Sequence, residues 1–272
     1  MKKILSILLV VIMAISCFAL VGCGGDATFE GNYEEATATD VQNFANSVDA
    51  ADGDTDIDIE DGYEINMEVK NMIQTTPMGT AVADLDMTFR VKSELGNMKV
   101  EGTAKGKTKY NAGVYSGMEI DANGKVYWTG GYLYSNESDT IRYQGQTQPQ
   151  EYKQKIQMED FDTYLNTYAQ NFDGLDFSEL VEMAVAVGDK MGLGISQDEN
   201  GTKIKFSIPV NNGVSGEMIF VFDNNYNLTS LKYDVTIGNT EDAMTIVATY
   251  KPYSGNVTLP NDLDTYQLVS PY

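Results

Sequence analysis

The stretch Ala83-Asp84-Leu85-Asp86-Met87-Thr88-Phe89-Arg90-Val91 decides the fold. Its apolar side chains occupy every second position, and polar side chains occupy the positions between them. Because successive side chains of a β-strand point to opposite faces of a sheet, this spacing predicts a strand with one buried and one solvent-exposed face. Such alternation is typical of antiparallel sheets, since strands of parallel sheets are covered on both faces and are apolar throughout.

The same period of two recurs along much of the chain. It predicts further strands at residues 63–70, 98–105, 114–120, 126–134, 141–143, 203–208, 218–222, 231–237 and 244–250. Because Asn, Asp and Gly tolerate positive φ, three segments are predicted to be hairpin turns. These are Asp121-Ala122-Asn123-Gly124, Asp198-Glu199-Asn200-Gly201 and Asp223-Asn224-Asn225-Tyr226-Asn227. The tail at residues 257–263 is expected to lie against the sheet.

Three segments have the helical period instead. One helix is predicted near residues 33–50, with Thr39 or Asp40 as its start signal. A second is predicted at residues 159–172 and a third at 176–191, which Gly192 and Gly194 are expected to end. The apolar side chains at helical spacing are Val41, Phe44, Ala45 and Val48 in the first helix, and Phe177, Leu180, Ala184, Val187 and Met191 in the third.

These patterns together predict an α+β fold. The expected architecture is a strongly curved antiparallel sheet of about ten strands, an unclosed barrel, with three helices packed on its concave face. No Pro- or Ser-rich linker divides the chain, so residues 34–272 are expected to form a single domain.

Composition excludes several classes of function. The chain has 18 basic and 40 acidic residues and a net charge of −22, which disfavours nucleic acid as a partner. It contains no histidine and two cysteines, which excludes Ser-His-Asp and Cys-His catalysis and the usual zinc sites. We therefore expect a protein that is not an enzyme and needs no cofactor.

Two kinds of functional site could be built from the many acidic residues: a calcium-binding loop and a pair of catalytic carboxylates. Asp52, Asp54 and Asp56 have the spacing of an EF-hand loop, but Ile57 stands where the loop needs glycine and Tyr63 where it needs glutamate. Residues 52–61 are therefore interpreted as a solvated connector, and weak cation binding there stays open. Nothing in the sequence singles out a pair of carboxylates for glycoside hydrolysis.

The N-terminal segment has the features of a secretory signal. Met1-Lys2-Lys3 precedes an apolar run at residues 4–20, and Leu20-Val21-Gly22-Cys23 follows. This ending resembles the lipobox of bacterial lipoproteins. The resemblance implies that residues 1–22 are removed, that Cys23 receives a diacylglycerol, and that residues 23–33 tether the domain outside the cell membrane. The alternative is a membrane-spanning helix with an incidental cysteine.

The order of predicted elements resembles the LolA/LolB-like superfamily, which includes lipid-carrying lipoproteins of mycobacteria and uncharacterised Gram-positive lipoproteins. The resemblance rests on the lipobox, the helix near residues 41–48, the helices at 159–191, the hairpin at 220–233 and Val257-Thr258-Leu259-Pro260. In that superfamily a cavity between sheet and helices holds acyl chains. The resemblance therefore implies an anchored carrier or sensor that binds a lipid or another hydrophobic molecule.

Methionine and aromatic side chains are the candidates for lining such a cavity, because methionine adapts to apolar ligands. The candidate lining residues are Met87, Met118, Trp128, Tyr132, Tyr164, Tyr168, Met183, Val187, Phe220 and Phe222. Trp128, Tyr132 and Tyr134 are expected to share one face, with Gly130 and Gly131 in mid-strand. The same residues fit an ordinary packed core, and the alternative function is a non-catalytic module that binds an envelope protein or a cell-wall component.

Overall fold

The computed structural model describes residues 29–51, 62–76, 79–94, 97–157, 177–187, 191–211, 214–237 and 244–269. The chain divides into two compact units. Unit 1 holds the described residues from 62 to 157 and from 253 to 269, and unit 2 holds those from 29 to 51 and from 177 to 252. The segment 1–23, the acidic connector and the predicted helix at 159–172 lie outside the described residues. The single-domain organisation stays a prediction.

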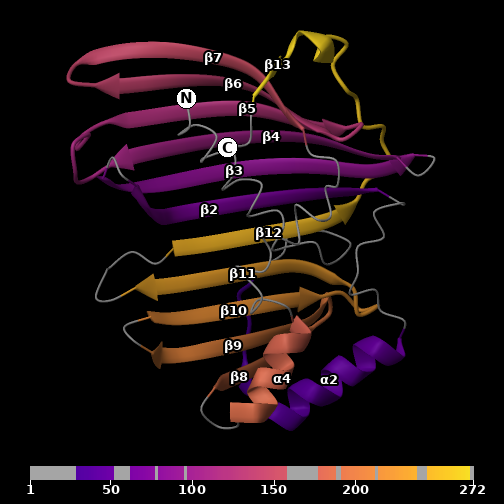
Figure 1. The fold of residues 1–272 in the computed structure, drawn as a ribbon. Coiled ribbons are helices and arrows are strands. Elements are labelled where there is room, and N and C mark those ends of the chain that lie inside the picture. The colour runs from indigo at the N-terminus through magenta and orange to yellow at the C-terminus, as the bar shows by residue number, and fades with distance from the viewer. Residues whose placement is uncertain are drawn as a thin grey trace. The chain divides into compact units, whose positions relative to one another are not determined.

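Unit 1 is a sheet in which strands that follow one another in the chain also lie side by side (Figure 1). Its strands are β2 (Tyr63–Thr76), β3 (Gly79–Glu94), β4 (Asn97–Tyr110), β5 (Glu119–Thr129), β6 (Tyr132–Tyr143), β7 (Gln146–Gln157) and β13 (Gln267–Leu268). All neighbours pair antiparallel except β13, which pairs parallel to β7.

The predicted division into a buried and a wet face is confirmed in unit 1. Met67 pairs with Met87, and Met87 pairs with Ala104, and all three side chains are buried. The next row on the same strands pairs Asp86 with Lys105, and both side chains are exposed. The alternation in the sequence therefore determines which face of each strand is buried.

The turn between β5 and β6 differs from the expectation. Residues 121–124, predicted to be a hairpin turn, lie inside β5, where Gly124 pairs with Glu137. The turn is formed by Gly130 and Gly131, with φ of 59° and 77°. Two-residue hairpins of this kind need positive φ at both central positions, which two glycines supply without steric cost. The expectation of mid-strand glycines at 130 and 131 was therefore wrong.

The strand predicted at residues 114–120 is mostly a loop. Residues 111–118 connect β4 to β5, and the strand begins at Glu119. Gly113 and Gly117 have φ of 96° and 82°, and the Gly117 N–H donates to the Tyr110 carbonyl at 2.8 Å. Val114 is 76% exposed, so the apolar period here does not mark a buried strand.

Strand β7 was not predicted at all. Its sequence, Gln146 to Gln157, is almost entirely polar, and only Ile156 is a buried apolar residue. The strand forms because β6 offers it a full ladder of backbone hydrogen bonds, which do not depend on apolar side chains. The short strand predicted at residues 141–143 is the end of the longer strand β6.

The C-terminal segment lies against the wet face of unit 1, as expected. Thr258 donates its N–H to the Glu101 carboxylate at 3.2 Å. The short 3-10 helix η2 (Leu263–Thr265) leads to Tyr266, which is 3% exposed and packs edge-on against Tyr134 with 5.5 Å between ring centroids. This packing holds the tail on the sheet after β12 has ended.

The strands of unit 2 also pair antiparallel, in the order β1-β8-β9-β10-β11-β12. Its strands are β1 (Glu34–Glu35), β8 (Gly192–Asp198), β9 (Gly201–Asn211), β10 (Val214–Phe222), β11 (Leu228–Ile237) and β12 (Met244–Pro252). The turns predicted at residues 198–201 and 223–227 are confirmed: Asp198 pairs with Gly201, and the Asp223 N–H donates to the Asn227 carbonyl at 2.8 Å.

Gly192 and Gly194 belong to β8 and do not end a helix, which corrects the expectation. Gly194 pairs with Glu35 of β1. A Cβ on Gly194 would lie 3.2 Å from the Cβ of Tyr33, so the small residue allows the β1 segment to approach closely.

Two α-helices are described, and both belong to unit 2: α2 (Ala38–Ala50) and α4 (Phe177–Val187). They pack against each other (Figure 1). The N-cap of α2 is Thr37, and not Thr39 or Asp40 as predicted. The Asp40 N–H donates to the Thr37 hydroxyl oxygen at 3.2 Å, while the Thr37 N–H donates to the Asp40 carboxylate at 2.9 Å. This reciprocal pair is a capping box with aspartate at its third helical position.

A cluster of phenylalanine rings fixes both helices on the sheet of unit 2. Phe177 of α4 packs edge-on against Phe220 at 5.3 Å and Phe222 at 5.0 Å between centroids. Phe44 of α2 packs against Phe222 at 5.1 Å. Edge-to-face aromatic pairs add about 0.5–1.5 kcal/mol to the burial of their surfaces. As predicted, Val41, Phe44 and Val48 form the buried face of α2.

The fold is α+β and rich in antiparallel pairing, as expected, but its elements differ in number. The described residues contain thirteen strands instead of about ten, and two α-helices instead of three. No helix in the described part of the chain is both long and apolar enough to cross a membrane.

Gly201 provides a test of the β8–β9 hairpin. Its φ is +142°, and a Cβ there would lie 1.9 Å from the Phe222 carbonyl oxygen. We expect Gly201→Ala to lower the free energy of unfolding by about 3 kcal/mol or more, measured by urea denaturation. Gly145→Ala is the control, because Gly145 has φ of +76° but open space around it. That change should cost about 1 kcal/mol, and equal losses for both variants would contradict the close approach.

Candidate functional site

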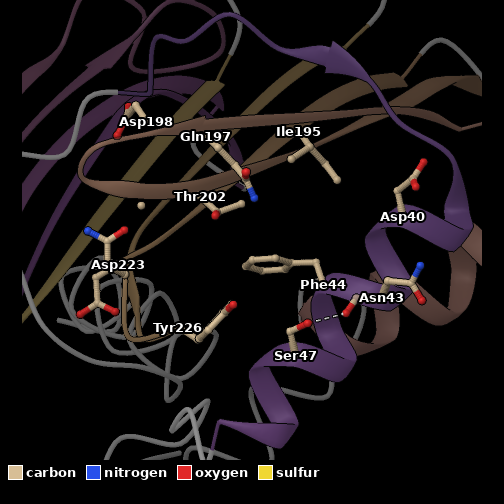
Figure 2. Close-up of a pocket in the computed structure, with 12 residues that line it drawn as sticks. Asp40, Asn43, Phe44, Ser47, Ile195, Gln197, Asp198, Thr202, Asp223 and Tyr226 are labelled. Atoms are coloured by element: carbon tan, nitrogen blue, oxygen red, sulfur yellow. Dashed lines mark hydrogen bonds between the residues drawn. The ribbon is translucent and has the colours of Figure 1, made fainter.

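A pocket of about 440 Å³ opens in unit 2 between helix α2 and two hairpin turns (Figure 2). This volume is within the usual range for small-molecule sites. The lining residues are Asp40, Asn43, Phe44 and Ser47 from α2, Ile195, Gln197, Asp198, Gly201 and Thr202 from the β8–β9 hairpin, and Asp223, Asn224 and Tyr226 from the β10–β11 turn.

Helix α2 forms one wall because its lining residues are spaced at i, i+3, i+4 and i+7 and therefore share one face. Asp40 is held in place by Thr37, whose hydroxyl donates to the carboxylate at 2.6 Å. The hydrogen bonds from the Thr37 hydroxyl and then from its N–H lower the pKa of Asp40. The negative charge at this edge of the pocket is therefore present at neutral pH.

The opposite wall is built by Asp223, which organises its own turn. One carboxylate oxygen of Asp223 accepts the N–H groups of Asn225 and Asn227, each at 2.8 Å. The Asn224 amide donates to the Glu199 carbonyl at 2.9 Å, which ties this turn to the β8–β9 hairpin. The two turns therefore form one connected surface.

Tyr226 and Phe44 are the aromatic residues of the pocket. Figure 2 shows the Phe44 ring extending from α2 into the space between Tyr226 and the β8–β9 hairpin, and the two ring centroids lie 5.8 Å apart. Tyr226 has φ of 65°, a left-handed conformation that costs a residue with a side chain about 1–2 kcal/mol. Strained residues of this kind cluster at ligand sites.

Asp198 is the third carboxylate on the pocket. It accepts the Asn200 N–H at 2.8 Å and lies 3.0 Å from the Lys203 ammonium, and these contacts lower its pKa. Each of the three carboxylates is thus held by groups of its own element or hairpin. Among the described residues, no three Asp, Glu, His or Cys side chains are grouped to hold a metal ion. The pocket can offer hydrogen-bond acceptors and an aromatic floor to a small ligand.

The candidate cavity residues of unit 1 do not come together at one site. Met87 and Trp128 lie on the buried face of the sheet. Met118 is buried in a separate cluster with Tyr110 and Ile120 at the end of the β4–β5 loop.

Tyr132 packs on the wet face beside Tyr134. Because the turn lies at residues 130–131, Trp128 pairs with Leu133 and is on the opposite face from Tyr132 and Tyr134. The predicted common face of these three residues was therefore wrong.

The candidate residues of unit 2 divide between core and surface. Phe220 and Phe222 are 2% and 1% exposed and pack within the phenylalanine cluster. Met183 and Val187 of α4 are 38% and 39% exposed, so the predicted placement of Val187 on the buried helix face was wrong. Tyr164, Tyr168 and Cys23 lie outside the described residues.

Sequence reasoning missed the pocket because its walls come from three separate segments. Taken alone, the polar residues of α2 are typical of a solvent-exposed helix face, and the two Asp/Asn-rich segments are typical of hairpin turns. Only the unusual density of aspartate and asparagine in both turns was a signal.

Sequence reasoning also missed two buried acids, Glu137 and Asp139, in β6. They are 8% and 3% exposed. Their positions in the sequence could have revealed them, because both are on the same face of β6 as Leu133 and Ile141. The period of two predicts apolar residues there. Burial, and secondarily the Asp139 charge, raises the pKa of Glu137 to about 7, and burial also raises the pKa of Asp139.

Comparison with known proteins adds no family. No family model matches the chain, and no curated protein matches it. A crystal structure of a proposed outer membrane lipoprotein-sorting protein domain from Vibrio parahaemolyticus is 11% identical, covers 84% of this chain and 97% of its own, and has a TM-score of 0.21. A TM-score this low carries no argument about fold or function. The LolA/LolB resemblance therefore rests only on the order of the predicted elements.

The raised pKa of Glu137 predicts a specific pH dependence of stability. The folded protein keeps this proton up to about pH 7, whereas the unfolded chain loses it near the ordinary value of 4.5. The free energy of unfolding should therefore fall as the pH rises from 4.5 to 7, by up to about 3 kcal/mol from this group. Glu137→Gln should remove that part of the slope in urea denaturation at several pH values, whereas Glu151→Gln on the exposed face should keep it. An unchanged slope in Glu137→Gln would refute the assignment.

Proposed function

We propose that this protein is a lipid-anchored, extracytoplasmic binding protein without catalytic activity, and that its pocket in unit 2 takes a polar ligand of the cell envelope. The observation that carries the proposal is the pocket between α2 and the two tied turns. It combines carboxylate, amide and hydroxyl side chains with the rings of Phe44 and Tyr226.

The chemistry of the lining favours a ligand rich in hydrogen-bond donors, such as a saccharide of the cell wall. Carboxylate and amide oxygens accept hydrogen bonds from hydroxyl groups, and an aromatic ring offers an apolar surface to the C–H face of a sugar. The charges of Asp40, Asp198 and Asp223 disfavour an anionic ligand. An acyl chain would leave these polar groups desolvated and without partners, which is costly.

The absence of catalysis is proposed from the roles of the same carboxylates. Asp40 caps α2, Asp223 organises its turn, and Asp198 pairs with Lys203. The pKa values of Asp40 and Asp198 are lowered, whereas a general acid needs a raised pKa. The chain also contains no histidine to act as general base.

The lipid anchor is proposed from Leu20-Val21-Gly22-Cys23. Two acyl chains attached at Cys23 would hold the domain stably at the membrane, because each buried methylene adds about 0.8 kcal/mol. The net charge of −22 would otherwise keep the domain away from anionic headgroups.

A second candidate function is the binding of a hydrophobic molecule on the buried face of unit 1. The observation that favours it is a set of apolar side chains on that face of neighbouring strands: Met67 of β2 pairs with Met87 of β3, and Trp128 of β5 pairs with Val100 of β4. Methionine is common at adaptable apolar binding surfaces.

The anchor is tested by fatty-acid labelling in a bacterial host. The wild-type chain should incorporate an alkyne-tagged fatty acid, and Cys23→Ala should incorporate none, because the thiol is the site of attachment. Cys17→Ala is the matched control and should keep the label, since Cys17 lies within the predicted signal. Equal labelling of the Cys23→Ala variant and the wild type would exclude the anchor.

The pocket is tested with uncharged N-acetylglucosamine oligosaccharides, which contain the amino sugar of the cell-wall glycan, as the probe. The double variant Asn43→Ala/Gln197→Ala removes one exposed amide from each wall, and we expect a loss of affinity of about tenfold or more by calorimetry. Asn46→Ala, on α2 but outside the pocket, should bind like the wild type. Identical affinities for the double variant and the wild type, or no binding by the wild type, would count against the polar ligand.

A further inference from the structure

The pocket of unit 2 carries an excess of negative charge. Among the described residues that line it, three are aspartates, Asp40, Asp198 and Asp223, and none is a lysine or an arginine. Asp40 and Asp198 are exposed and Asp223 is partly exposed, so solvent reaches all three side chains. A ligand that enters this space of about 440 Å³ therefore meets charges of one sign.

Only one of the three carboxylates is paired with a cation. The Lys203 ammonium lies 3.0 Å from Asp198 and also donates to the Glu30 carbonyl oxygen at 2.7 Å. None of the ion pairs in the described part of the chain involves Asp40 or Asp223. Two negative charges of the pocket are therefore uncompensated within the described structure.

The two uncompensated carboxylates can still accept hydrogen bonds from a ligand. Thr37 donates its N–H and its hydroxyl to one oxygen of Asp40, and the other oxygen accepts none of the hydrogen bonds described. Asp223 accepts three hydrogen bonds, all from Asn225 and Asn227 of its own turn. Because an ionised carboxylate has about four acceptor sites, each of the two aspartates has room for a further donor.

An aromatic surface lies between these two charges. Figure 2 shows Asp40 on one side of the pocket and Asp223 on the other, with the Phe44 ring between them and Tyr226 beside it. Phe44 is 8% exposed, whereas Tyr226 is partly exposed, so Tyr226 is the ring that a ligand can cover. This order of groups matches an elongated ligand with positive charges along its length and apolar C–H surface between them.

We propose that the pocket selects a saccharide built from amino sugars whose amino groups carry no acetyl group, with one ammonium group at Asp40, another at Asp223 and a sugar ring on Tyr226. This inference rests on the proposed function and names the class of saccharide. An ammonium group supplies three donors and the positive charge that the two aspartates lack. Acetylation of the amine removes the charge and leaves a single N–H donor.

The lining favours this ligand over its alternatives. An N-acetylated sugar donates from its hydroxyl groups but leaves both aspartate charges uncompensated. A phosphorylated or carboxylated sugar is repelled by the three aspartates. A linear polyamine supplies the charge but offers no ring face to Tyr226 and no hydroxyl groups to Asn43 and Gln197. A metal ion lacks a ligand set, since the described residues contain no group of three acidic, histidine or cysteine side chains.

The trisaccharides of glucosamine and of N-acetylglucosamine test this selection, because they differ only in their acetyl groups. The full chain, purified in a non-ionic detergent, is titrated by calorimetry at about pH 6, where the amines are protonated and the aspartates ionised. We expect the glucosamine trisaccharide to bind about fivefold or more tightly than its acetylated form. This advantage should shrink at about 1 M salt, which screens exposed charges.

Competition separates the pocket from the rest of the acidic surface. An excess of the N-acetylglucosamine trisaccharide should displace the glucosamine trisaccharide, because both occupy one site. A glucosamine trisaccharide that is attracted only by the net charge of −22 would not be displaced by an uncharged sugar, and that result would overturn the assignment.

Substitutions then assign the ammonium contact. Asp40→Asn removes one charge and keeps an oxygen for the Thr37 N–H, so we expect about threefold weaker binding of the glucosamine trisaccharide and unchanged binding of its acetylated form. Glu182→Gln is the matched control, because it removes the same charge from an exposed position on α4 of the same unit. Equal losses in both variants would contradict a contact at Asp40.

The outcomes distinguish this inference from the proposed function. Equal affinities of the two trisaccharides, both weakened in Asn43→Ala/Gln197→Ala, would overturn the selection of free amines and leave saccharide binding in place. Spermidine that binds as tightly as the glucosamine trisaccharide would overturn the role of the sugar ring. No saturable binding of either trisaccharide would overturn both proposals. The comparison of ligands needs no variant, so it stands if Asp40→Asn fails to fold.

Discussion

Strands β2, β3 and β4 of unit 1 present one row of side chains to a buried face and most of the next row to water, and the rest of the sheet depends on this constraint. Antiparallel pairing places equivalent rows opposite one another, as in the series Met67, Met87 and Ala104. A shift of one residue in any pair would exchange the two faces of that strand, so burial fixes the register along the whole sheet. Strand β7 has little apolar surface of its own and is held by the register that β6 imposes.

Unit 2 obeys the same rule but covers its sheet with helices. Phe177 and Phe44 bring α4 and α2 onto the ring cluster formed with Phe222, and this packing positions α2 beside the two hairpin turns. The pocket is the consequence, because the exposed edge of α2 does not fill the space above the turns. Asp40, Asp198 and Asp223 first serve the local geometry of the helix and the turns, and they then present their remaining acceptor capacity to the pocket.

The buried acids of unit 1 are the exception to its pattern. Glu137 and Asp139 occupy positions that the alternation assigns to apolar residues, and their exposure confirms that they are buried there. Proteins that break a local rule in this way do so most often at functional sites. The paired positions of β5 carry small residues, with Gly124 opposite Glu137 and Ala122 opposite Asp139.

The sequence by itself determined the class of fold and several of its local features. The period of two predicted antiparallel strands, the helical period placed Val41, Phe44 and Val48 on one buried face, and Asp/Asn-rich segments located two turns. These features depend on neighbours within a few residues, whose effects can be read from one segment. The absence of histidine likewise excluded whole classes of chemistry without any structure.

Only the tertiary structure decided which turn closes β5 and β6, that β7 exists, and which candidate residues lie together. The turn forms at Gly130 and Gly131 because residues 121–124 are paired with β4 and β6 as part of strand β5. The pocket joins three segments that are distant in the sequence. Their positions follow from cross-strand register and ring packing, and a local pattern of residues carries no information about either.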